Sequence, residues 1–106
     1  MDSSLKLSFD QAMYGIYRKA KKEVKYDAHR YFNMLEKHGG LETAHILVNS
    51  PAESEGYTTL WELGRLDLTV EALIFDNTEY QTLFTKEELL KIKKRLQNYG
   101  YNPVVL

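Results

Sequence analysis

Three charged residues are the first candidates for chemistry: Glu23, Asp27 and Arg65. In one continuous helix, Glu23 and Asp27 lie a turn apart and close to the apolar face. A carboxylate buried there needs a partner, because an isolated buried charge is costly. Arg65 is the only Lys or Arg between residues 51 and 84. We therefore predict that these residues form a buried ion pair; a catalytic carboxylate with a shifted pKa is the alternative.

A second group of residues could bind phosphate. Basic side chains recur opposite the apolar face of the first predicted helix, with Tyr14 among them, and again on the last predicted helix. Such a stripe can follow a nucleic-acid backbone. The candidates for phosphate contact are Arg18, Lys22, Lys25, Lys91, Lys94 and Arg95. The alternative is an ordinary solvated face, which we favour because the net charge is only −1 and no groove-reading motif is present.

The histidines do not form a recognisable metal site. Glu42 and His45 have the Glu-x-x-His spacing of di-iron helical bundles, but those bundles need the motif twice and it occurs here once. The chain has no cysteine, no phosphate-binding glycine loop and no nucleophile motif. The sequence therefore assigns no catalytic, cofactor-binding or metal-ligating residue.

Trp61 is the only tryptophan, in an apolar turn with Leu60 and Leu63. Tryptophan dominates binding hot spots, but a single Trp in a small domain is more often its core anchor. We predict a core position, with an exposed recognition patch as the alternative.

These residues are carried by helices. Ser8 and Gln11 match a capping box, and apolar residues then recur at three- and four-residue steps. This predicts one long helix over residues 9–38, ended by Gly39-Gly40. The alternative is two helices, with Asp27 as the N-cap of the second; the grouping of Asp27 with Glu23 then disappears.

Shorter helices follow. The pattern predicts a helix over 41–48, one capped by Thr58 or Thr59, and one with its apolar face over 66–74. Asn77 is predicted to cap a short turn, and Thr85 with Glu88 forms a capping box for a last helix that Gly100 ends. The prediction is an all-α small bundle: a single domain over 1–106, with one long N-terminal helix, four or five shorter helices, and loose tails at 1–7 and 101–106.

Composition limits the class of protein. At 106 residues, 43% of them hydrophobic, the chain predicts one globular domain. It shows neither a signal peptide nor a run long enough to span a membrane, so we expect a cytoplasmic protein with no membrane contact. Charge is uneven: residues 1–50 carry +2, 51–84 carry −6, and 85–106 carry +3.

Several runs resemble a group of small bacterial helical proteins. They are His-Gly-Gly-Leu-Glu-Thr-Ala at 38–44, Gly-Tyr-Thr-Thr-Leu-Trp-Glu at 56–62, Arg-Leu-Asp-Leu-Thr-Val-Glu at 65–71, Leu-Phe-Thr at 83–85 and Arg-Leu-Gln-Asn-Tyr-Gly-Tyr at 95–101. The resemblance covers nearly the whole chain after Ser8. It implies a self-contained helical module and brings no established activity or catalytic residues with it.

We expect a non-catalytic protein-interaction module that needs no cofactor. Self-association into a homodimer is one way to cover so long a helix. The alternative is a nucleic-acid-associated accessory domain that uses the basic stripe. An enzyme built around Glu23, Asp27 and Arg65 is a third and more distant option.

Overall fold

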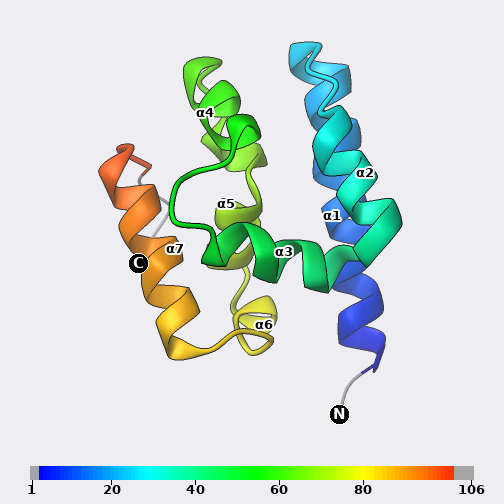
Figure 1. Cartoon of the computed structure of the whole chain (residues 1–106), viewed down its shortest axis with the longest axis vertical. Coiled ribbons are helices and arrows are strands. Elements are labelled where there is room, and N and C mark those ends of the chain that lie inside the picture. The colour runs from blue at the N-terminus through cyan, green and yellow to red at the C-terminus, as the bar shows by residue number, and fades with distance from the viewer. Residues whose placement is uncertain (1–2, 102–106) are drawn as a thin grey trace.

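The computed structural model describes residues 3–101, and all the regular elements in that range are helices (Figure 1). The elements are α1 (Ser3–Val24), α2 (His29–His38), α3 (Gly40–Asn49), α4 (Glu55–Glu62), the 3₁₀ helix η1 (Leu66–Leu68), α5 (Val70–Phe75), α6 (Thr78–Gln81) and α7 (Lys86–Asn98). No strand occurs in the described range, which confirms the all-α prediction.

The prediction of one helix over 9–38 is wrong, because the chain leaves the helix after Val24 and starts α2 at His29. Lys25 has a φ of 58°, and the amide of Tyr26 bonds back to the carbonyl of Ala20 at 3.1 Å. An unbroken helix of that length would measure about 45 Å. The longest dimension of the fold is only 37 Å. The break lets α2 return along α1 (Figure 1).

Asp27 does not cap α2, so the two-helix alternative is right about the break and wrong about the cap. The residue before α2 is Ala28, and no side chain caps that helix. The Asp27 carboxylate instead accepts a hydrogen bond from the Tyr17 hydroxyl at 2.7 Å. Asp27 therefore ties the linker of residues 25–28 to α1.

The start of the chain also differs from the prediction. α1 begins at Ser3, and Leu5 packs against the core, so residues 3–7 are not a loose tail. Ser8 lies inside this helix and cannot cap it; its hydroxyl lies 2.7 Å from that of Tyr80. At the other end, the Tyr101 hydroxyl donates to Asp76 at 2.5 Å. The predicted tail residues 1–2 and 102–106 lie outside the described residues.

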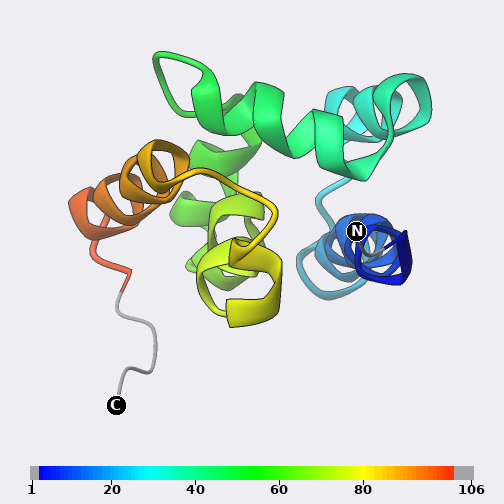
Figure 2. The ribbon, with the colours of Figure 1, turned by 90° about the horizontal axis from the view of Figure 1, so that it is seen from below.

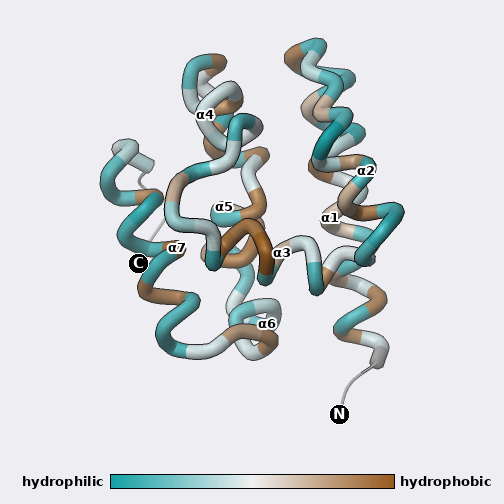
Figure 3. The backbone as a smooth tube through the Cα atoms, in the orientation of Figure 1, coloured by the Kyte–Doolittle hydropathy of each residue, from teal (hydrophilic) through white to brown (hydrophobic). Residues whose placement is uncertain are grey.

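α3 lies between the α1–α2 pair and the remaining helices (Figure 2), and it carries an apolar run at 46–48 (Figure 3). Val48 of this run is buried, whereas Ile46 is exposed. The helix approaches α1 closely at Gly40, whose amide donates to the Asp10 carboxylate at 2.6 Å. A Cβ on Gly40 would lie 2.8 Å from the Cα of Asp10. The core around this crossing contains Phe9, Met13, Leu35, Val48, Ile74, Ile92 and Leu96.

Caps define the ends of the later helices. Ser54, rather than Thr58 or Thr59, caps α4 by accepting from the amide of Tyr57 at 3.1 Å. Thr85 forms the predicted capping box that starts α7. Helix α7 ends at Asn98, shortly before Gly100, as predicted, and α4 ends at Glu62, shortly before Gly64. None of the helices within residues 3–101 has both the length and the apolar character needed to cross a bilayer.

Candidate functional site

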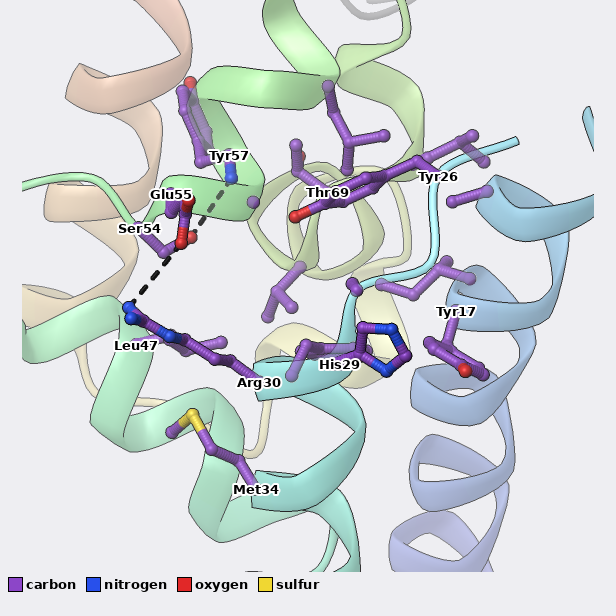
Figure 4. A pocket seen from close by; sticks show the side chains of 18 of the residues that line it. Tyr17, Tyr26, His29, Arg30, Met34, Leu47, Ser54, Glu55, Tyr57 and Thr69 are labelled. Carbon is purple, nitrogen blue, oxygen red and sulfur yellow. Dashed lines mark hydrogen bonds and ion pairs between the residues drawn. The ribbon is translucent and has the colours of Figure 1, made fainter. Parts of the chain in front are cut away.

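A cavity of about 580 Å³ lies between two parts of the fold. One side is formed by α1, the linker of residues 25–28 and the first turns of α2. The other is formed by the starts of α4 and α5 together with η1 (Figures 1 and 4). The break after Val24 creates this cavity, because it brings the linker and the start of α2 opposite α4.

A small second hydrophobic cluster holds one end of the cavity together. Val24 and Tyr26, at the end of α1, pack against Ala20, Leu60 and Leu68. This contact joins α1 to α4 and η1 beyond the main core. It fixes the separation of the two sides, so the cavity is part of the folded architecture.

Four tyrosines line the cavity: Tyr17, Tyr26, Tyr31 and Tyr57. Partners within the chain hold three of their hydroxyl groups. Tyr17 donates to Asp27 at 2.7 Å, Tyr31 to the carbonyl of Met13 at 2.7 Å, and Tyr57 to the carbonyl of Arg95 at 3.0 Å. The rings are therefore fixed, and they supply aromatic walls (Figure 4).

Glu71, in the first turn of α5, places a buried carboxylate in the cavity wall. Its Oε2 accepts a hydrogen bond from Nη1 of Arg95 at 2.8 Å, and the two side chains are only 4% and 9% exposed. Arg95 also donates to the carbonyls of Leu47 at 3.2 Å and Ser50 at 3.0 Å. Burial raises the pKa of Glu71, and the hydrogen bond from Arg95 opposes that rise.

The sequence analysis missed this pair and placed Arg95 among the phosphate-contacting residues. That assignment is wrong, because the Arg95 guanidinium lies inside the fold. The pattern that could have placed it was present. Arg95 follows Ile92 by three residues and precedes Leu96, both of which are core positions of α7.

The rim of the cavity carries opposite charges. Arg30 reaches from the first turn of α2 toward Glu55 at the start of α4, with a closest approach of 3.5 Å (Figure 4). Both side chains are well exposed, at 89% and 74%. Asp27 lies 3.5 Å from Lys21 and 3.7 Å from His29. The hydrogen bond from Tyr17 lowers the pKa of Asp27, although partial desolvation opposes it.

Two of the three residues predicted to form a buried ion pair meet. Nη2 of Arg65 lies 2.7 Å from Glu23, and the guanidinium also holds Asp67 through two hydrogen bonds of 3.0 and 3.1 Å. Asp27 is not part of this group, because the chain turns at Lys25. The group is not deeply buried, since the Arg65 and Glu23 side chains are 27% and 37% exposed. The hydrogen bonds that Arg65 donates to Asp67 and Glu23 raise the pKa of Arg65.

The remaining residues of the predicted basic stripe are exposed, but they lie on separated helices. Arg18 and Lys22 belong to α1, with Lys25 just after it, and Lys91 and Lys94 belong to α7. α1 and α7 stand on opposite sides of the fold in both ribbon views (Figures 1 and 2). These side chains therefore form two basic regions and not one continuous stripe.

The Glu-x-x-His residues point to different partners. Glu42 lies 3.7 Å from His38, whereas Nδ1 of His45 lies 2.6 Å from Glu88. Glu88 also accepts from Asn49 at 2.8 Å. No cluster of three or more potential ligands from His, Cys, Asp and Glu is found within residues 3–101.

Trp61 is not a core anchor, so that prediction is wrong. Its side chain is on the surface, 44% exposed, and so is Leu63 at 45%. The indole packs edge-on against Tyr99, with ring centroids 5.2 Å apart. Tyr57, four residues before Trp61 in α4, takes the buried position instead.

Comparison with known proteins identifies no relative of this chain. No family model matches this chain, and neither a curated protein nor a solved structure matches it.

Proposed function

We propose that this chain is a non-catalytic binding module and that a small molecule occupies the cavity between the α1–α2 side and the α4–α5 side. One observation carries the proposal: a chain of only 106 residues forms a cavity of about 580 Å³, open to solvent on one side, with aromatic walls and one buried carboxylate. Pockets of about 300–1,000 Å³ with apolar walls and a few fixed polar groups are the usual form of ligand sites.

The polar groups of the cavity favour binding over catalysis. Tyr17 and Tyr31 already donate to acceptors of this chain, and Arg95 holds Glu71. A general base or a nucleophile must be free to exchange a proton with its substrate. Fixed groups of this kind instead present a preorganised surface, which lowers the entropy cost of binding.

The test is a thermal-shift screen with small aromatic compounds of positive, neutral and negative charge. A ligand at 100 times its Kd stabilises the fold by about 2.7 kcal/mol. That raises the Tm of a domain of this size by roughly 10 °C.

Gly56 supplies a matched pair of variants for this screen. It lines the cavity, and a Cβ there would meet the Tyr26 hydroxyl at an ordinary 3.5 Å. Gly56→Ala should therefore keep ligand binding, whereas the longer side chain of Gly56→Leu should abolish it. Equal affinity of the two variants for every hit would contradict the proposal.

A second candidate function is protein contact through the Trp61 surface, which we define as Trp61 and Leu63. Tryptophan is the residue most enriched at binding hot spots, and two large apolar side chains lie exposed at this end of α4. We propose self-association as its form. Light scattering over a range of concentrations tests this: Leu63→Ser should weaken the dimer, and Leu90→Ser, at an exposed site on α7, should not. A monomer at every concentration would eliminate this candidate.

A further inference from the structure

The charges of the cavity wall indicate which class of molecule it takes. The wall contains three carboxylates, from Asp27, Glu55 and Glu71, and one guanidinium, from Arg30. We propose that the ligand is an organic cation: an ammonium group that contacts Glu71, attached to an apolar body that packs among the tyrosines. This inference rests on the proposed function, since it names the ligand of the same cavity.

Glu71 is the innermost of the three carboxylates. Arg95 donates to its Oε2 and directs its other donors to the carbonyls of Leu47 and Ser50. The carboxylate also accepts a hydrogen bond from the backbone amide of Glu71, and we assign its remaining acceptor capacity to the ligand. A charge-assisted hydrogen bond to a carboxylate that is only 4% exposed is stronger than the same bond in water.

The tyrosines favour the same charge. A cation over the face of an aromatic ring is attracted by the ring quadrupole. Burial, and after it the negative charge of Glu71, raises the pKa of both Tyr31 and Tyr57. The negative charge of Glu71 therefore reaches two separate tyrosines of the cavity wall, and the same charge attracts a cation bound between them.

Each of the three carboxylates has a positive partner: Arg95 for Glu71, Arg30 for Glu55, and Lys21 with His29 for Asp27. Arg95 and Lys21 do not line the cavity. Arg30 and His29 have side chains 89% and 81% exposed, so they extend from the rim into solvent. Three helices, α2, α4 and α5, start at the cavity, and helix starts attract anions. The first turn of α4 carries Glu55 and that of α5 carries Glu71, so the chain's own carboxylates occupy two of these starts. The first turn of α2 carries no acidic residue, and the anionic probe below tests the attraction of that start.

The experiment compares three probes that share one body: 3-phenylpropylamine, 3-phenylpropanol and 3-phenylpropionate. Isothermal titration gives a Kd for each on the full chain. We expect the amine to bind about tenfold more tightly than the alcohol, the gain expected for one charge-assisted hydrogen bond. The propionate should bind more weakly than both.

Variants of Tyr26 test the aromatic contribution without disturbing the buried ion pair. Glu71→Gln is not used, because it would leave Arg95 without its counter-charge and destabilise the fold. Tyr26→Phe keeps the ring, whereas Tyr26→Leu removes it and keeps an apolar side chain. Tyr26→Leu should weaken amine binding by about threefold or more relative to Tyr26→Phe. Alcohol binding should change less.

The outcomes separate this inference from the proposed function. If the alcohol or the propionate binds as tightly as the amine, the inference is overturned while the cavity remains a ligand site. If none of the three probes binds at millimolar concentration, the inference is also overturned. The proposed function fails only if the wider screen on Gly56→Ala and Gly56→Leu gives no cavity-dependent hit.

Discussion

Replacing Arg95 by methionine removes the guanidinium that joins α7 to α5 and to the end of α3. Arg95 donates to Glu71 and to the carbonyls of Leu47 and Ser50, and its side chain is only 9% exposed. The variant leaves the Glu71 carboxylate buried without a counter-charge. Breaking a buried ion pair in this way costs about 3–5 kcal/mol.

That loss is large for a domain of this size. Single domains unfold with about 5–15 kcal/mol. With a urea m-value of about 1.5 kcal/mol/M, Arg95→Met should lower the unfolding midpoint by roughly 2–3 M. Far-UV circular dichroism measures the midpoint, and the fluorescence of Trp61 gives an independent probe of the same transition.

Two variants make the result specific. Lys94→Met changes the exposed neighbour of Arg95 and should alter stability by no more than about 0.5 kcal/mol. The double variant Glu71→Met with Arg95→Met replaces both charges by apolar side chains of similar length, and should recover at least half of the loss. A loss below about 1 kcal/mol for Arg95→Met, or strict additivity in the double variant, would refute the reasoning.

Four further substitutions test the fold. Gly40→Ala should lower the free energy of unfolding in urea by about 1–3 kcal/mol, because its Cβ would lie 2.8 Å from the Cα of Asp10. Gly15→Ala is the control: its Cβ would meet nothing within 4 Å, so it should stabilise α1 by about 0.5–1 kcal/mol. Lys25→Gly should stabilise the fold by up to about 1 kcal/mol, because Lys25 has a φ of 58°, which glycine adopts without strain. A loss of stability would indicate that the helix continues through residue 25. Glu88→Gln should cost about 1 kcal/mol at neutral pH. Hydrogen bonds to Glu88 lower its pKa from 4.5 although burial opposes them, so the difference from wild type should vanish as pH falls below 4.5 and should not grow there.

Local chemistry made several parts of the fold predictable. Thr85 caps α7 because its side chain and that of Glu88 satisfy amides at the helix start, and this pattern is visible in four consecutive residues. Gly39 and Gly100 mark helix ends because they adopt positive φ, which other residues rarely do. These features depend on neighbours in the sequence and not on the tertiary fold.

The break at Lys25 could not be predicted in the same way. No glycine or proline marks it, and the apolar rhythm continues through the linker. Tertiary packing decides the conformation instead, because Tyr26 gains contacts with the cluster around Leu60 and Leu68. The cavity depends on this break, so the candidate site was beyond the reach of the sequence pattern.

The pairing of charges failed for a related reason. Arg65 was matched with Glu23 and Asp27, 42 and 38 residues away, because it is the only base in residues 51–84. In the fold Arg65 meets Glu23, whereas Asp27 bonds to Tyr17. Glu71 was not considered, although it lies in the apolar period of its helix. Helical periodicity shows that a charged residue is buried, and only the packing of helices shows which partner it meets.

The most direct test of the central claim is an amide-resolved NMR titration of the full chain with 3-phenylpropylamine. A molecule bound in the cavity should shift the amide signals of Gly56 in α4, Tyr31 in α2 and Thr69, the N-cap of α5, all of which line it. The amides of Lys93 and Gln97, on the exposed face of α7, should not move. Shifts confined to α7 or to the Trp61 surface, with the cavity signals unchanged at saturation, would contradict the account.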